Sequence, residues 1–260
     1  MDGTALHEDK SFSVMNLRAI RRVMESGVML VPATGRSARN TTGFLTGISG
    51  IRYIIGANGA LIYDVEEDKT IIEDFIDLPA ALSAISTLSE LDVNVYAHMR
   101  DGIILRSADV DGRFAKLFPM VEFPVPGETP PLAERLSAVR EGIPKLGVFA
   151  YDASTINSLL SVKNRFLGLT LCRTGPLTVE INSATASKGS ALRYLCQRLG
   201  IAREGVLAIG DNDNDKTMME FAGYSVAMGN AIAEIKRIAD EVTLTNDEDG
   251  VAAFLETHWR

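Results

Sequence analysis

The sequence predicts an α/β protein that has a mostly parallel sheet and a second, inserted α+β domain. Near the start and the end of the chain, short apolar runs alternate with amphipathic helices, which is typical of a parallel sheet covered on both faces. Between these stretches, apolar and polar residues alternate singly along the strands, as in a sheet with one open face. We therefore expect a core of residues 1–77 and 183–260 and an inserted domain of residues 78–182.

The first core stretch begins with a helix, because apolar residues recur at helical spacing between the N-cap Ser13 and the stop Gly27. The run VMLVPATG then predicts a buried strand that ends in a turn, and residues 37–45 predict a second helix. The segment YIIGANGALIYD breaks at Asn58-Gly59, which favours a type I′ hairpin between two apolar strands.

The second core stretch repeats this alternation. A helix is expected from about Lys188 to Leu199, with Gly200 as its stop, and the strand GVLAIGD follows. Another helix begins near Asp215 and leads to the strand YSVAMGN. Asn230 is expected to cap the next helix, AIAEIKRIAD.

The inserted domain is expected to present an open sheet face. In DVNVYAHMR the side chains of Tyr96, His98 and Arg100 share that face and are the candidates for contact with a substrate, although His98 is also compatible with an ordinary surface residue. Asp101-Gly102 predicts a hairpin after this strand. The other expected elements are helices near 80–91, 131–141 and 154–163 and the strands KLGVFAY, LGLTLCR and LTVEIN.

The composition favours a soluble protein with a small-molecule partner. The formal net charge is -8 and no run of basic residues occurs, which disfavours a surface for nucleic acid. No apolar stretch is long enough to span a membrane, and the two cysteines, Cys172 and Cys196, have no CxxC spacing. We expect a cytoplasmic protein with no nucleic-acid or membrane partner; the sequence carries no signal for an oligomeric state.

The segment AIGDNDND places Asp211, Asp213 and Asp215 together after an apolar strand. Carboxylates this close repel one another unless a cation or solvent separates them, and an all-oxygen site suits Mg²⁺. An EF-hand loop would need Gly and Glu where the chain has Lys216 and Ala222, so that alternative fails. Taken alone, the motif is equally compatible with a solvated acidic loop.

Three further short stretches are candidates for an anion site. Thr34 and Gly35 lie in PATGRS, where a strand turns into a helix and free N–H groups favour an anion. Lys188 lies at the head of its helix, where the helix dipole disfavours a cation and a bound phosphate would remove the conflict. Asp2 belongs to the opening MDGT. Alone, each is compatible with an ordinary turn, a solvated lysine or an N-terminal tripeptide; together they lie where ligands bind in an open α/β sheet.

With these motifs in this order, the chain resembles the haloacid dehalogenase superfamily of phosphohydrolases. It is most similar to the Cof-type class (subfamily IIB), which has a Rossmann-like core and a large inserted α+β cap of the C2 type. The matching stretches span nearly the whole chain: DGT, PATGR, IIGANGALIYD, ATASKGSAL, IGDNDNDKTMM and VAMGNA.

The resemblance implies hydrolysis of a phosphate monoester of a small metabolite through an aspartyl-phosphate, with Mg²⁺ as cofactor. A sugar phosphate is the expected substrate. Thr34 and Lys188 would hold the transferring phosphoryl group, with Gly35 beside them, and Asn214 would contact its oxygens.

The resemblance also implies the metal site and the proton transfer. Asp211 would ligate Mg²⁺, and Asp215 would hold a metal-bound water from the second shell. Asp2 would contribute its backbone carbonyl to the metal, and its carboxylate would act as general acid and then as general base.

The chain departs from the family motif D-x-D-G-T, in which the first Asp is the nucleophile. Met1 occupies the "x", so the nucleophile and the central strand that leads into it are absent from these 260 residues. Without this strand the core would lose about five buried apolar side chains, whose burial contributes on the order of 10 kcal/mol of stabilising free energy. This loss is comparable to the free energy of unfolding of a whole domain, about 5–15 kcal/mol. We expect a sequence that begins late, or another segment that fills the gap.

Two other functions fit the same motifs. Without a nucleophile, Thr34, Lys188 and Asp211 would still hold Mg²⁺ and a phosphorylated ligand in a non-catalytic binding protein. A phosphomutase would need a cationic clamp in the inserted domain, for which Arg100, Arg106 and Arg173 are available.

Overall fold

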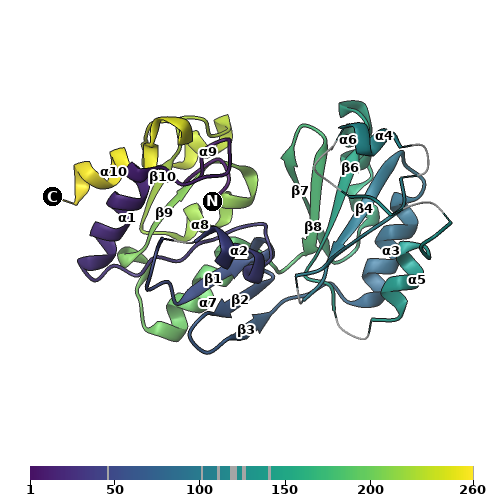
Figure 1. Ribbon diagram of the computed structural model, residues 1–260, viewed down its shortest axis with the longest axis horizontal. Coiled ribbons are helices and arrows are strands. Elements are labelled where there is room, and N and C mark those ends of the chain that lie inside the picture. The colour runs from purple at the N-terminus through teal and green to yellow at the C-terminus, as the bar shows by residue number, and fades with distance from the viewer. Residues whose placement is uncertain are drawn as a thin grey trace. The chain divides into compact units, whose positions relative to one another are not determined.

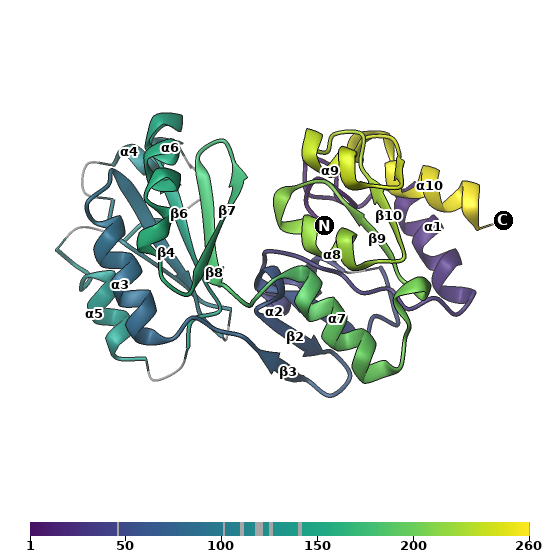
Figure 2. The ribbon, with the colours of Figure 1, turned by 180° about the vertical axis from the view of Figure 1, so that it is seen from behind.

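The computed structural model describes residues 1–45, 47–100, 102–109, 112–117, 122–124, 127–139 and 142–259. The chain forms two compact units, one of residues 1–73 and 186–260 and the other of residues 74–185. These boundaries lie within a few residues of those expected from the sequence. Figures 1 and 2 show the elements of each unit from opposite sides.

The helices of the first unit begin and end largely where the sequence places them. Ser13 Oγ accepts a hydrogen bond from the N–H of Asn16 at 2.9 Å, and Ser37 caps the second helix in the same way. Gly200 ends its helix with φ +68°. The helices of this unit are α1 (Val14–Glu25), α2 (Ala38–Phe44), α7 (Lys188–Leu199), α8 (Lys216–Phe221), α9 (Ala233–Ile238) and α10 (Gly250–His258).

The strands of the first unit form two three-stranded sheets in the described residues. One is antiparallel, in the order β1-β2-β3, with β1 (Tyr53–Gly56), β2 (Leu61–Asp64) and β3 (Lys69–Glu73). The other is parallel, in the order β11-β10-β9, with β9 (Leu207–Gly210), β10 (Tyr224–Ala227) and β11 (Glu241–Val242). α1 and α10 lie side by side, and α7 packs against α8 (Figures 1 and 2).

Two details of the first sheet differ from the expectation. The hairpin between β1 and β2 forms, but a 3₁₀ turn and Ala60 join its strands instead of a two-residue type I′ turn, with φ of +60° at Asn58 and +98° at Gly59. The predicted strand VMLVPATG was wrong: it forms only an isolated parallel bridge between Ala33 and Ile55. A strand needs continuous pairing, and this segment has one neighbour at one end.

The second unit is a five-stranded antiparallel sheet in the order β5-β4-β6-β8-β7. Its strands are β4 (Val93–His98), β5 (Ile104–Arg106), β6 (Lys145–Ala150), β7 (Leu169–Gly175) and β8 (Thr178–Ser183). Its helices are α3 (Leu78–Leu88), α4 (Arg113–Leu117), α5 (Leu132–Ser137) and α6 (Ala153–Ser161). Side chains from α3, α5 and α6 pack with the strands in one apolar core. The predicted hairpin residue Asp101 lies outside the described residues.

The expectation of an open face on this sheet was wrong. Tyr96 and His98 of β4 are each 8% exposed, and the rings of Phe149 and His98 pack against Tyr96. Lys145 on β6 is buried and forms an ion pair with Glu180 on β8. The side chains at the centre of this face are therefore buried.

Short 3₁₀ turns connect several elements: η1 (Ala57–Gly59), η2 (Lys163–Arg165), η3 (Arg203–Gly205), η4 (Asp213–Asp215) and η5 (Asn246–Glu248). Across the described part of the chain, every helix is too short or too polar to cross a membrane.

Candidate active site

Most of the predicted site residues of the first unit meet where its strands end. Asp211 follows β9, Thr34 follows residues 28–33, and Lys188 is the first residue of α7. Gly35 lies in the bend between Thr34 and α2. Hydrogen bonds link these segments, and they show which side chains face one another.

Lys188 and Asp215 form a buried ion pair at the centre of this group. Lys188 Nζ donates to Asp215 Oδ1 at 2.6 Å, and both side chains are 4% exposed. Asp215 Oδ2 accepts the N–H groups of Asp211 at 3.0 Å and Asn212 at 3.1 Å. Burial alone would raise the pKa of Asp215, but Lys188 and these donors hold that pKa below its ordinary value. Gly210 leaves room for the pair, since a Cβ there would lie 2.6 Å from the Cβ of Asp215.

Asp211 is only partly buried, and its carboxylate has less compensation than that of Asp215. Burial and the charge of Asp215 raise the pKa of Asp211, and a hydrogen bond from Thr4 Oγ1 opposes that rise. Gly3 has φ +67°, and a Cβ at this position would collide with the Asp211 carboxylate. The glycine and threonine of the opening MDGT therefore have a structural reason: one allows close approach to Asp211, and the other binds it.

Asp2 points to a different set of partners. Its carboxylate accepts two hydrogen bonds from Arg36, 2.9 Å from Nε and 2.6 Å from Nη2, and Lys10 Nζ lies 3.5 Å away. The Arg36 guanidinium stacks 4.0 Å above the ring of Phe44. Burial would raise the pKa of Asp2, but Arg36 and Lys10 hold that pKa well below its usual range. Sequence reasoning missed this pairing, although Arg36 stands in the quoted motif PATGR.

The carboxylates of Asp2, Asp211 and Asp215 do not converge on one point. Each has its own partner: Arg36, Thr4 and Lys188 respectively. Within the described residues, no group of three His, Cys, Asp or Glu side chains is close enough to hold a metal ion.

Asparagine side chains hold the N-terminal segment against the rest of the unit. Asn230 donates a hydrogen bond to the carbonyl of Gly3 (2.8 Å). In the same way, Asn16 donates to the carbonyl of Ala5 (3.2 Å) and Asn246 to that of Leu6 (3.0 Å). The prediction that Asn230 caps a helix was wrong: α9 has Ile232 at its N-cap, with no side-chain cap bond. Asn230 instead fixes the position of residue 3, beside Asp2 and Thr4.

Thr34 is connected to Asn214 through a residue that sequence reasoning did not select for the site. Thr34 is buried, and its Oγ1 accepts from the N–H of Arg36 at 3.1 Å. Asn58 donates its N–H to the carbonyl of Thr34 at 3.0 Å, and its Oδ1 accepts from Asn214 Nδ2 at 3.0 Å. The signal was present in the Asn-Gly of the hairpin, which we interpreted only as a turn.

The predicted residues of the second unit lie in varied surroundings. Arg100 is exposed, and Arg106 on β5 is about half-buried. Arg173 donates to the carbonyl groups of Gly175 (3.1 Å) and Pro176 (3.0 Å) in its own hairpin. Tyr96 and His98 are buried, as described above.

Comparison with known proteins identifies similar proteins over nearly the whole chain. A profile of haloacid dehalogenase-like hydrolases matches residues 1–255. The chain is 27% identical over 270 residues to the 5-amino-6-(5-phospho-D-ribitylamino)uracil phosphatase YitU of Bacillus subtilis (strain 168), covering 100% of this chain and 95% of that protein. It is 30% identical over 268 residues to the pyridoxal phosphate phosphatase YbhA of Escherichia coli (strain K12), covering 99% of this chain and 96% of that protein.

The fold is also similar to that of solved structures. The structure of TM0651 from Thermotoga maritima superposes with a TM-score of 0.79 at 30% identity, covering 98% of this chain and 94% of that one. Because the likeness includes the inserted domain, it confirms the predicted fold class, an α/β core with an α+β insertion.

Proposed function

Because the chain belongs to the family of haloacid dehalogenase-like hydrolases, we propose that it uses Mg²⁺ to hydrolyse phosphate monoesters of small metabolites. The family match confirms the resemblance seen in the motifs. The relatives named as phosphatases establish the coarse activity, hydrolysis of phosphoric monoesters. The observation that carries the finer proposal is the buried pair of Lys188 and Asp215 beside Asp211, at the ends of the strands.

Thr34, Lys188 and Asn214 would bind the phosphoryl group. Lys188 has three N–H donors and one of them is directed at Asp215, so the ammonium group retains donors for phosphate oxygens. Thr34 and Asn214 are held in place through Asn58. Such fixed donors favour the charge that develops on a transferring phosphoryl group.

The acidic residues suit a hard cation. Burial and the charge of Asp215 raise the pKa of Asp211, so a cation beside these carboxylates would relieve an existing electrostatic cost. Asp211 would ligate Mg²⁺, and the backbone carbonyl of Asp2 would be a further oxygen ligand. Asp215 would hold a metal-bound water. When bound, Mg²⁺ supplies charge stabilisation to the phosphoryl oxygens.

Asp2 would move the proton. A general acid at neutral pH needs a raised pKa, whereas Arg36 holds the pKa of Asp2 low. The Asp2 carboxylate would therefore have to leave Arg36 before it protonates the leaving group. The covalent step needs an aspartate two residues before Asp2, and we propose that an aspartyl-phosphate forms only when that position is occupied.

The substrate class follows from the chemistry of the relatives. YitU and YbhA are named for substrates in which a side chain of a nitrogen heterocycle carries a phosphate ester. Phosphorylated heterocycles therefore join sugar phosphates as the two classes to be tested for this chain.

The experiment compares two forms of the protein: the 260 residues, and a form extended before Met1 by an apolar strand that ends in Asp. Phosphate release is measured from an aryl phosphate, a sugar phosphate and pyridoxal 5′-phosphate, with Mg²⁺ or with EDTA. The extended form should hydrolyse at least one substrate in Mg²⁺ only, and Asp211→Asn should abolish the activity. The matched change Asp213→Asn alters an exposed acid of the same motif and should preserve it. No hydrolysis, or equal loss in both variants, would overturn the proposal.

Non-catalytic binding of a phosphorylated ligand is the second candidate, favoured by the pairing of Asp2 with Arg36. It predicts that phosphate and Mg²⁺ raise the melting temperature of both forms while neither turns over. A phosphomutase would instead require a bisphosphate in the same assay.

A further inference from the structure

The turn between β1 and β2, residues 57–59, has an unusual backbone. Ala57, Asn58 and Gly59 have φ of +48°, +60° and +98°, so three consecutive residues lie in the left-handed region and two of them carry a Cβ. For a residue with a Cβ this conformation is strained, and it persists only where the surrounding structure holds it. The turn is also buried, with Ala57 1% and Asn58 5% exposed. Contacts with other segments therefore hold this turn in place.

The backbone of the turn binds the segment that carries Thr34. Ala57 donates its N–H to the carbonyl of Arg36 at 2.8 Å, and Asn58 donates its N–H to the carbonyl of Thr34 at 3.0 Å. In an extended strand, consecutive N–H groups point in opposite directions. The left-handed backbone of the turn allows both N–H groups to reach one segment.

The side chain of Asn58 binds a second segment of the site, the 3₁₀ turn that follows β9. Asn58 Oδ1 accepts a hydrogen bond from Asn214 Nδ2 at 3.0 Å. An amide oxygen can only accept, so this contact selects the NH₂ end of Asn214. The second N–H of that NH₂ group is then available for another acceptor, such as a phosphate oxygen.

Gly59 packs against the third segment, the head of α7. A Cβ at Gly59 would collide with the carbonyl of Ser187 and would lie 2.8 Å from the backbone nitrogen of Lys188. Glycine therefore allows the turn to approach the first residue of this helix. The three residues of the turn thus contact the segments that carry Thr34, Asn214 and Lys188.

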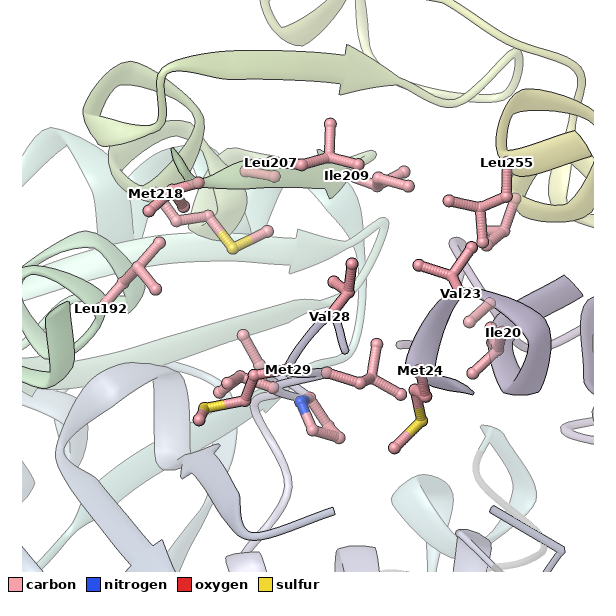
Figure 3. Close-up of a pocket in the computed structure, with 18 of the residues that line it drawn as sticks. Ile20, Val23, Met24, Val28, Met29, Leu192, Leu207, Ile209, Met218 and Leu255 are labelled. Atoms are coloured by element: carbon pink, nitrogen blue, oxygen red, sulfur yellow. The ribbon is translucent and has the colours of Figure 1, made fainter. Parts of the chain in front are cut away.

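The apolar contacts of these segments do not orient their polar groups. The residues before Thr34, those of β9 and those of α7 line an apolar cavity, which Figure 3 shows with Val28, Met29, Leu192, Leu207 and Ile209 around it. Apolar contacts have no preferred direction, whereas a hydrogen bond does. The hydrogen bond from Asn58 is therefore the kind of contact that can fix the amide of Asn214.

We propose that Asn58 is a positioning residue for the phosphoryl group: it holds Thr34 through its backbone and orients the NH₂ group of Asn214 through its side chain. This role rests on the proposed function, which assigns Thr34, Lys188 and Asn214 to one phosphate. An uncharged acceptor suits it, because an aspartate at position 58 would bind the same NH₂ group but repel a phosphate dianion.

The first measurement tests the orientation of Asn214 without any ligand. The 260-residue chain is labelled with ¹⁵N, and exchange with water is measured for the side-chain NH₂ of Asn214. Asn58→Gly keeps the left-handed backbone and its N–H but removes the acceptor, so this exchange should become about fivefold faster or more. Asn58→Asp keeps an acceptor and should preserve the slow exchange. Unchanged exchange in Asn58→Gly would overturn the proposal.

The second measurement tests the consequence for the ligand. Inorganic phosphate is titrated in the presence of Mg²⁺, and the amide signals of Thr34 and Lys188 are followed. Asn58→Gly should weaken phosphate binding by about fivefold to tenfold. Asn58→Asp should also weaken it, although Asn214 stays in place, because of the added charge.

Asp68→Gly is the matched control. Asp68 also has a left-handed backbone, with φ +48°, but it lies in the turn at the other end of β2, so this variant should bind phosphate like the unaltered chain. An equal loss in Asp68→Gly, or equal affinity in Asn58→Gly and the unaltered chain, would overturn the positioning role alone. If the unaltered chain binds no phosphate, the proposed function fails and this role fails with it.

Discussion

Lys188 and Asp215, 27 positions apart, form an ion pair that water hardly reaches, with Nζ 2.6 Å from Oδ1. Lys188 is the first residue of α7, where the helix dipole disfavours a cation. The sequence suggested that a bound phosphate balances this charge. In the structure Asp215 balances it directly, so the lysine is held in place before any ligand arrives.

The first prediction concerns the energy of this pair. Lys188→Met leaves a buried carboxylate without its cation and should lower the free energy of unfolding by about 3–5 kcal/mol. Asp215→Asn should cost a similar amount, and the double variant should cost clearly less than the sum of the two. Urea unfolding of the four proteins measures the coupling. If the single effects add to within about 0.5 kcal/mol, the pair is not coupled.

The second prediction concerns the contact of Arg36 with Asp2. Arg36→Met removes two hydrogen bonds and a charge, so the pKa of Asp2 should rise toward its ordinary value. A lowered pKa stabilises the fold above pH 3.8 and that contribution is lost as the pH falls, so the variant should lose less stability in acid. The carboxyl carbon shift of Asp2 between pH 2 and 7 measures the change. Arg36→Lys keeps the charge without the forked geometry and should be intermediate; identical titrations would contradict the assignment.

Local features of the fold were predictable from the sequence. Helix ends depend on contacts within one turn of the same helix, as at the caps Ser13, Ser37 and Gly200. The residue types near a helix end therefore suffice to locate that end. The position of Lys188 at the head of its helix was likewise predictable.

Non-local features were not predictable. The partner of Asp2 is 34 residues away, and nothing in MDGT points to Arg36. The run VMLVPATG has the residues of a buried strand, yet it pairs only at Ala33, because a strand depends on its neighbours and not on its own sequence alone. His98 was placed on an open face because alternation identifies two faces but not what covers the second.

The third prediction compares two glycines that have nearly the same backbone angle φ. Gly59 has φ +98° and Gly27 has φ +94°, so alanine should cost about 1–2 kcal/mol at either position from backbone strain. At Gly59 a Cβ would also collide with the carbonyl of Ser187, whereas nothing lies within 4 Å at Gly27. Gly59→Ala should therefore cost about 1–3 kcal/mol more than Gly27→Ala in urea unfolding. Equal costs would show that the loop moves away without penalty.

The fourth prediction concerns the buried imidazole of His98. Burial, together with the charges of Lys145 and Arg106, holds the pKa of His98 well below 6.5, and within the described residues its Nδ1 has no hydrogen-bond partner. The folded state therefore binds this proton less readily than the unfolded state does. A lowered pKa contributes stability above pH 6.5 that is lost as the pH falls, so the second unit should weaken between pH 6.5 and 5.

The variant His98→Gln has no group that titrates in this range and should show a smaller loss of stability between pH 7.5 and 5. His258→Gln is the matched control, because that side chain is 37% exposed and lies in the first unit. In this variant the second unit should lose as much stability in acid as it does in the unaltered protein. Urea unfolding followed by the near-ultraviolet signal of Tyr96 and its aromatic neighbours reports on the second unit. An unchanged pH dependence in His98→Gln would mean that protonation of the imidazole is as favourable in the folded state as in the unfolded state. The charges of Lys145 and Arg106 oppose that protonation, so the smaller loss is the expected result.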